Sequence, residues 1–179
     1  MIRVHLLNSE KGRNRQCFQL FKQYRNVFAN IGVEFVTSGR CDYTFVGFED
    51  FINRKVSLEE SVNTGIDLVN SIQTPVFLFD CSDSTSLLGS YEVFSNSKAK
   101  FLFKNQLLKN QEDYVKETSF NKWFFPDSDI CKKGYDIPDK HWFRIKLSGW
   151  NLGSLNPSFH HFVDIPEEIP AAVDVCAIW

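Results

Sequence analysis

Two acidic side chains lie close together in the segment Asp80-Cys-Ser-Asp-Ser-Thr85, which directly follows a short apolar run. Carboxylates at this spacing can serve as general acid and base, or can bind a divalent cation. The structural alternative is that Asp83 or Ser84 caps the next helix, while Asp80 accepts hydrogen bonds from loop amides. We name Asp80 and Asp83 as the candidate catalytic residues and predict no metal ion.

Polar side chains also follow two other apolar runs, at Asn8 to Gly12 and at Lys104-Asn105. The carboxyl ends of parallel strands meet at one edge of a sheet, where open α/β sheets bind their ligands. Lys104 can contact a phosphate there, or a carboxylate such as Asp80. The glycine spacing of a dinucleotide-binding loop is missing, so we predict no cofactor. The candidate ligand-binding residues are Asn8, Ser9, Ser84, Thr85, Lys104 and Asn105.

The cysteines and histidines form no clear catalytic or metal-binding pattern. The five cysteines are odd in number and irregularly spaced, so we predict no disulfide framework and no zinc site, and we expect a reducing, cytoplasmic location. Cys81 has the chemistry of a nucleophile, although a buried structural thiol is the commoner case. His160 and His161 are adjacent and point to opposite sides of an extended chain, so we expect a surface or loop role for both.

The overall composition is that of a folded globular chain. Its 179 residues suit one domain with a sizeable core, and 18 phenylalanines are expected mainly to fill that core. A net charge of −2 disfavours binding to nucleic acid. No apolar run approaches the ~18 residues of a spanning helix, so we predict no membrane insertion.

The apolar pattern alternates between strand and helix periods. Strands are predicted at residues 2–7, 33–37, 42–47, 76–79, 99–103 and 142–147. Helical patterns cover residues 17–31, 58–72, 84–94 and 107–115, and a capping box of Ser57 and Glu60 precedes the second. This alternation predicts an α/β, Rossmann-like fold: a mostly parallel sheet with helices on both faces, which is a three-layer sandwich.

The last part of the chain predicts a domain boundary. Residues 121–140 have no stable period and are expected to form a long loop or lid. An acidic connector bounded by Pro166 and Pro170 leads to an apolar run that ends at Trp179. We expect a Rossmann-like domain at residues 1–165, and a connector with the first strand of a second domain at 166–179. An apolar face left for that second domain would favour homodimers.

Four segments resemble a group of glycosyltransferases from microbial and viral genomes, built on the GT-B plan of two facing Rossmann-like domains. The order and spacing of these segments agree over residues 42–179. They are residues 77–85 with the sequence FLFDCSDST, 99–108 with AKFLFKNQLL, 146–153 with KLSGWNLG and 173–178 with VDVCAI.

This resemblance implies the amino-terminal, acceptor-side half of an enzyme that transfers a sugar from a nucleotide sugar to a hydroxyl acceptor. The implied partners are the sugar acceptor and the nucleotide sugar, which the second domain would mainly hold. Asp80 or Asp83 would then deprotonate the acceptor hydroxyl. The alternative is a stand-alone Rossmann-like binding or regulatory module without catalytic activity.

Overall fold

A six-stranded parallel sheet forms the centre of the protein. The computed structural model describes residues 1–53, 55–82, 85–105, 107–108, 111–115 and 134–147. The strands are β1 (Ile2–Leu6), β2 (Val33–Val36), β3 (Tyr43–Gly47), β4 (Val76–Asp80), β5 (Phe101–Lys104) and β6 (Ile145–Leu147). Each strand pairs in parallel with its neighbours, which confirms the predicted α/β fold with a parallel sheet.

The strand order places a topological switch point between β1 and β3. The order across the sheet is β2-β1-β3-β4-β5-β6, so the chain runs from β1 to the β2 edge and then returns past β1 to β3. In open parallel sheets the loops separate at such a point, and ligands bind at the carboxyl ends of the two strands. The strand order therefore predicts that a ligand would bind at the segments that follow Leu6 and Gly47.

One face of the sheet is lined by aromatic side chains. Phe45, Phe79 and Phe103 come from three neighbouring strands, with ring centroids 4.7 Å apart for the first pair and 4.8 Å apart for the second. Phe18 and Phe21 pack onto them from the segment after β1, which contains three short helices. These helices are α1 (Asn14–Cys17), α2 (Gln19–Gln23) and α3 (Arg25–Asn30). The expected core-filling role of phenylalanine is confirmed on this face.

The predicted continuous helix over residues 17–31 is interrupted at Phe18 and Tyr24. Both residues have φ near −100° with ψ between 0° and 25°, outside the helical region. The segment is rich in aromatic and asparagine side chains, whose helix propensity is weak. Phe18 and Phe21 are still fully buried against the sheet. The apolar spacing therefore identified the buried face correctly, whereas the prediction of one unbroken helix was wrong.

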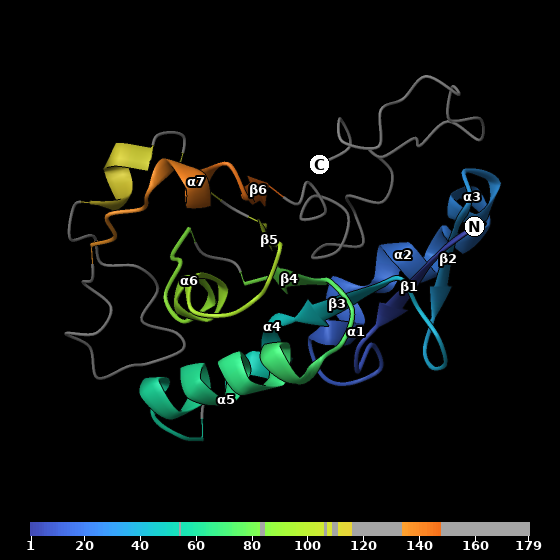
Figure 1. The fold of residues 1–179 in the computed structure, drawn as a ribbon, viewed down its shortest axis with the longest axis horizontal. Coiled ribbons are helices and arrows are strands. Elements are labelled where there is room, and N and C mark those ends of the chain that lie inside the picture. The colour runs from blue at the N-terminus through green and yellow to red at the C-terminus, as the bar shows by residue number, and fades with distance from the viewer. Residues whose placement is uncertain (54, 83–84, 106, 109–110, 116–133, 148–179) are drawn as a thin grey trace.

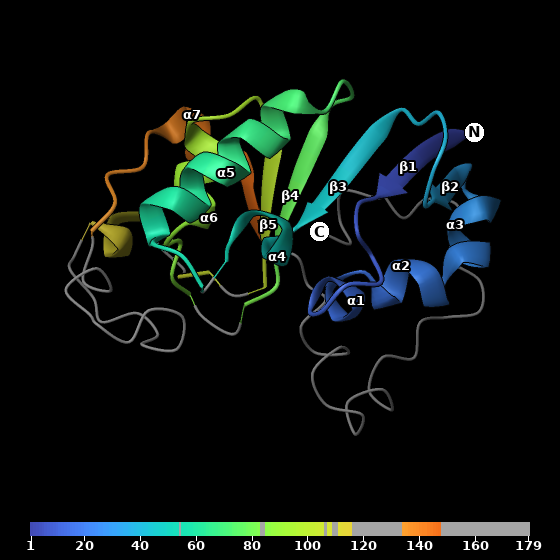
Figure 2. The ribbon, with the colours of Figure 1, turned by 90° about the horizontal axis from the view of Figure 1, so that it is seen from below.

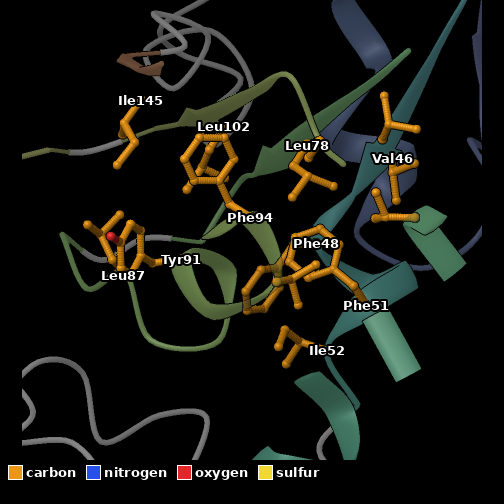
Figure 3. Packing of buried hydrophobic residues seen from close by; sticks show 14 of the residues in the cluster. Val46, Phe48, Phe51, Ile52, Leu78, Leu87, Tyr91, Phe94, Leu102 and Ile145 are labelled. Atoms are coloured by element: carbon orange, nitrogen blue, oxygen red, sulfur yellow. The ribbon is translucent and has the colours of Figure 1, made fainter. Parts of the chain in front are cut away.

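Aliphatic residues dominate the opposite face, which is covered by α4 (Phe48–Phe51), α5 (Leu58–Ser71) and α6 (Ser90–Ser95). Figure 1 shows α5 and α6 together beside the middle of the sheet, while α1 to α3 lie at the end that carries β1 and β2. Val46, Leu78 and Leu102 alternate along their strands with the phenylalanines and meet side chains from these helices, as Figure 3 shows. The three-layer arrangement is thus built by the period-two alternation of each strand.

The remaining helices differ in extent from their predictions. The Ser57 hydroxyl accepts a hydrogen bond from the Glu60 amide at 3.1 Å, so the predicted cap of α5 is confirmed. Helix α6 begins only at Ser90, and the helical pattern predicted over residues 107–115 contains a 3-10 helix, Gln111–Tyr114. Trp142 ends the short helix α7 (Asp139–Trp142) instead of beginning a strand. The predicted domain boundary, most of the predicted lid, Asp83, Ser84 and both adjacent histidines lie outside the described residues.

Candidate functional site

Asp80 forms a buried ion pair with Lys104 at the carboxyl ends of β4 and β5. The two residues are paired in register, and Lys104 Nζ lies 3.2 Å from Asp80 Oδ2. Lys104 also donates a hydrogen bond of 2.7 Å to the Ser82 hydroxyl, and the Ser82 amide donates to Asp80 Oδ1 at 3.0 Å. Asp80 is 1% exposed and Lys104 is fully buried. These contacts match the structural alternatives, in which Asp80 binds loop amides and Lys104 meets a carboxylate.

Further hydrogen bonds surround the Asp80–Lys104 pair. The backbone N–H of Asn105 donates to the backbone carbonyl oxygen of Asp80 at 3.2 Å, and Asn105 is buried. The Tyr114 hydroxyl donates to the Thr85 carbonyl oxygen and accepts a hydrogen bond from the Leu108 amide, each at 2.9 Å. Burial raises the pKa of Tyr114 to about 12, and the Asp80 charge adds to this rise. The Asp80 carboxylate is therefore enclosed in this conformation.

A second carboxylate, Asp50 on α4, lies at the switch point. The Asn8 side-chain amide donates to Asp50 Oδ1, and the Asn14 side-chain amide donates to Asp50 Oδ2, each at 2.7 Å. Asn14 is 1% exposed, whereas Asp50 is half-buried. Figure 2 shows α4 directly beyond the carboxyl end of β3 and beside α1. This arrangement joins the segments that follow β1 and β3 around one carboxylate.

Glu49 forms a second connection between the same two segments. Its Oε2 atom accepts a hydrogen bond of 2.7 Å from the Arg13 amide, and its Oε1 atom lies 3.8 Å from Arg13 Nε. Gly12 precedes this contact with a φ of +40°, and a Cβ atom added at that position would overlap the Glu49 carboxylate. The turn after β1 therefore favours glycine because of its positive φ.

An open pocket of about 440 Å³ adjoins Asp50. Its lining combines a partly apolar floor with charged, amide and hydroxyl groups, a mixture suited to a small polar molecule. The lining residues are Phe48, Glu49, Asp50, Ile52, Asn53, Lys55 and Thr64. Asp50 is the member that is both half-buried and held by hydrogen bonds from other segments.

The environment of Asp50 alters its acidity. Burial raises the pKa of the Asp50 carboxyl group above its ordinary value of 3.8. Hydrogen bonds from Asn8, from the Gly47 backbone and from Asn14 oppose this rise, as does the positive charge of Lys11. A raised pKa makes a carboxylate a stronger proton acceptor, provided that it remains ionised at the working pH.

A disulfide bond joins Cys17 on α1 to Cys81, the residue after Asp80. The prediction of no disulfide from the cysteine spacing was therefore wrong for this pair. The two residues are 64 positions apart, and only the packing of α1 beside the end of β4 brings them together. Cys41 is the free cysteine among the described residues. The hypothesis of a reactive Cys81 thiol does not apply while the disulfide is formed.

The predicted site residues separate into two groups. Asp80, Lys104 and Asn105 lie together in the interior, whereas Asn8 and Ser9 follow β1 near the switch point. Ser9 is buried, and its carbonyl oxygen accepts a hydrogen bond from Lys22 Nζ. Thr85 is half-buried and uses its carbonyl oxygen to bind Tyr114, as described above.

Sequence analysis missed Asp50 and Asn14. The signal available was the pair Glu49-Asp50, which follows the predicted strand ending at Gly47. The importance of that strand end becomes evident only from the strand order, which places β3 next to β1. Asn14 lies seven residues beyond the predicted first strand, and its partner is 36 residues further along the chain.

Comparison with models of protein families, with curated proteins and with solved structures found no match. Within the described residues, no three histidine, cysteine, aspartate or glutamate side chains gather as a metal site would require. None of the helices in that part of the chain is both long and apolar enough to cross a membrane.

Proposed function

We propose that this chain is the acceptor-side domain of a glycosyltransferase that transfers a sugar from a nucleotide sugar to a hydroxyl acceptor. The observation that carries the proposal is the pocket beside Asp50, where a half-buried carboxylate adjoins amide and hydroxyl side chains. Carboxylates and amides hydrogen-bond well to sugar hydroxyls. The parallel sheet, the pocket at its carboxyl edge and the resemblance described above support the same function.

Asp50 is the residue that we propose as the general base. It would accept the proton of the acceptor hydroxyl while that oxygen bonds to the anomeric carbon, and the nucleoside diphosphate would leave with the electrons of the broken bond. Burial raises the pKa of the Asp50 carboxyl group, which favours this role. In the GT-B plan a second domain would hold most of the nucleotide sugar.

Asp80 is less suited to this chemistry than Asp50. A carboxylate that is 1% exposed and paired with a buried lysine has no access to an acceptor in this conformation. The role of Asp83 stays a prediction from the sequence. If Asp80→Asn and Asp83→Asn both retained full sugar transfer in an intact enzyme, the original assignment of the base would be rejected and Asp50 would remain.

The second candidate function is a stand-alone module that binds a small polar molecule without catalysis. It is favoured by the lining of the pocket, which comes from α4, the segment after α4 and α5, without help from another domain. Such a module would use the same pocket, and ligand identity would distinguish the two functions. The cytoplasmic location and the homodimer stay predictions in either case.

The binding proposal can be tested on the 179-residue chain with saturation-transfer NMR. A panel of free sugars and nucleotide sugars would be added to the protein, to Asp50→Asn and to Asp136→Asn. We expect a free sugar to bind, and Asp50→Asn to weaken binding by about tenfold or more, since a hydrogen bond to a charged group contributes about 1.5–3 kcal/mol.

Asp136→Asn is the matched control. It makes the same chemical change at an exposed residue before α7, which lies apart from α4 in Figure 1. Sugar affinity should be unchanged in this variant. Absence of binding by every sugar, or equal effects of the two substitutions, would contradict the proposal; binding of a non-sugar molecule in the same pocket would favour the stand-alone module.

A further inference from the structure

The Asp50 carboxylate is held by two neutral side-chain amides from distant segments, beside a hydrogen bond from the Gly47 backbone. Asn8 donates to one oxygen and Asn14 to the other, and these donors lie 42 and 36 residues before Asp50 in the sequence. A carboxylate has about four acceptor positions, so these three donors leave capacity for a ligand. The two bonds therefore fix the plane of the carboxylate without using all of its hydrogen-bonding capacity.

The Asn14 side chain packs against the backbone of Gly47. A Cβ atom added at Gly47 would overlap the side-chain oxygen of Asn14, so the amide lies directly against the backbone at the end of β3. Gly47 has a φ of −85°, which any residue can adopt, and the requirement at this position is therefore one of space. With 1% of its surface exposed, Asn14 has little freedom to turn its amide away from Asp50.

Asn8 reaches Asp50 from a left-handed backbone conformation. Its φ is +47°, a value that asparagine adopts more readily than most other residues. This turn directs the side chain from the end of β1 toward α4, where its amide lies 2.7 Å from Asp50 Oδ1. The sequence thus places a suitable residue at a position where both the backbone and the side chain are constrained.

We propose that Asn8 and Asn14 are positioning residues that hold the Asp50 carboxylate, in its charged form, for contact with a ligand hydroxyl in the adjoining pocket. The amides donate to the carboxylate and carry no charge, so they favour its ionised form without neutralising it. A lysine partner would neutralise the charge, as Lys104 does for Asp80. This inference rests on the proposed role of Asp50, although the position and charge of the carboxylate can be tested without a ligand.

A purely structural connection between the two segments is the competing explanation. Glu49 offers the control. It links the same two segments by accepting a hydrogen bond from the Arg13 backbone amide, and it makes no hydrogen bond to Asp50 among the contacts described. Loss of a structural link should lower the free energy of unfolding in a Glu49 variant and in an Asn8 variant alike. Only loss of a positioning donor should raise the pKa of Asp50.

The experiment measures the pKa of the Asp50 carboxyl carbon by NMR in the 179-residue chain and in Asn8→Gly, Asn14→Ala and Glu49→Gln. Glycine preserves the positive φ at position 8, so Asn8→Gly removes the donor with little backbone strain. We expect the pKa of Asp50 to rise in both asparagine variants. In Glu49→Gln it should fall or stay constant, because a neighbouring negative charge is removed.

Sugar affinity, measured as above, should fall by about tenfold in Asn8→Gly, which corresponds to one hydrogen bond to a charged group. If Asn14→Ala fails to fold, Asn8→Gly still decides the outcome. An unchanged Asp50 pKa in Asn8→Gly, or an unchanged sugar affinity beside a raised pKa, would overturn the inference. If the wild-type chain bound no sugar while the pKa rose as expected, the proposed function would fail and the positioning of Asp50 would stand.

Discussion

Two carboxylates at the same edge of the sheet, Asp80 and Asp50, differ in their burial and in the charge of their partners. Asp80 is enclosed and faces the ammonium group of Lys104 at 3.2 Å. Asp50 is half-buried, adjoins a pocket and is held by the neutral amides of Asn8 and Asn14. The position of a residue at a strand end is therefore insufficient to identify a ligand contact, because the charge of its partner and its access to solvent decide what it can bind.

The different partners of Asp80 and Asp50 should give the two residues different effects on stability. A buried ion pair must offset the cost of removing two charges from water, and removal of one partner leaves the other charge uncompensated. A half-buried carboxylate beside amide donors leaves no opposite charge behind when it is removed. Substitutions at Asp80 should therefore affect folding most, whereas substitutions at Asp50 should mainly affect binding and acidity.

The largest expected effect is that of Asp80→Asn. This change leaves the Lys104 ammonium group buried without its counter-charge, and we expect the free energy of unfolding to fall by about 3–5 kcal/mol. Asp50→Asn should cost about 1 kcal/mol, in the range of one hydrogen bond. Urea unfolding of the two variants at neutral pH measures both values.

The double variant Asp80→Asn/Lys104→Met is the control for this prediction. Methionine fills a similar volume without charge, so most of the stability lost in Asp80→Asn should return. Equal losses in Asp80→Asn and Asp50→Asn, or no recovery in the double variant, would show that the two carboxylates do not differ in the way the contacts indicate.

A smaller effect should follow loss of the Cys17–Cys81 disulfide, which connects α1, the helix that carries Asn14, to the residue after Asp80. We expect Cys17→Ala/Cys81→Ala to lose about 2–4 kcal/mol of unfolding free energy, a typical contribution for a disulfide that closes a loop of this size. Urea unfolding with and without a dithiol reductant makes the measurement, since the reductant should destabilise the wild type and leave the double variant unchanged.

Cys41→Ala serves as the matched cysteine control. Cys41 is the free cysteine of the described residues, so its replacement should change stability by less than about 0.5 kcal/mol. A reductant that left the wild-type chain as stable as before would contradict the prediction.

The fold was predictable because its signals are local and repeated. Phe77 and Phe79 alternate with Val76 and Leu78, and this continuous apolar run predicted a strand buried on both faces. Helix propensity is a weaker signal, which explains why the helix predicted over residues 17–31 breaks at Phe18. The Phe18 ring packs edge-on against Phe79 of β4, a contact between distant residues that no sequence period contains.

The site was less predictable because it depends on contacts between distant segments. Asn8 and Lys104 were recognised as residues at strand ends, and Asp80 was named as one possible partner of Lys104. Asp50, the partner of Asn8, became evident only from the strand order. Cys17 and Cys81 show the same limit, since their spacing of 64 residues gives no sign of a bond. The sequence predicted which polar residues follow each strand. It did not predict which carboxylate is buried in an ion pair and which adjoins a pocket.

The smallest expected effect is the pH dependence that Asp50 gives to stability. Burial raises the pKa of its carboxyl group in the folded protein above the ordinary value of 3.8, so the folded state holds this proton at pH values where the unfolded chain has lost it. The stability contributed by protonated Asp50 is fully present below pH 3.8 and is lost as the pH rises through the folded pKa. Asp50→Asn removes this titration, so the unfolding free energy of the wild type minus that of the variant should decrease with pH across that window. Urea unfolding at closely spaced pH values measures this difference, and the contributions of the other carboxyl groups cancel between the two proteins. A difference that stayed constant with pH would contradict the raised pKa of Asp50.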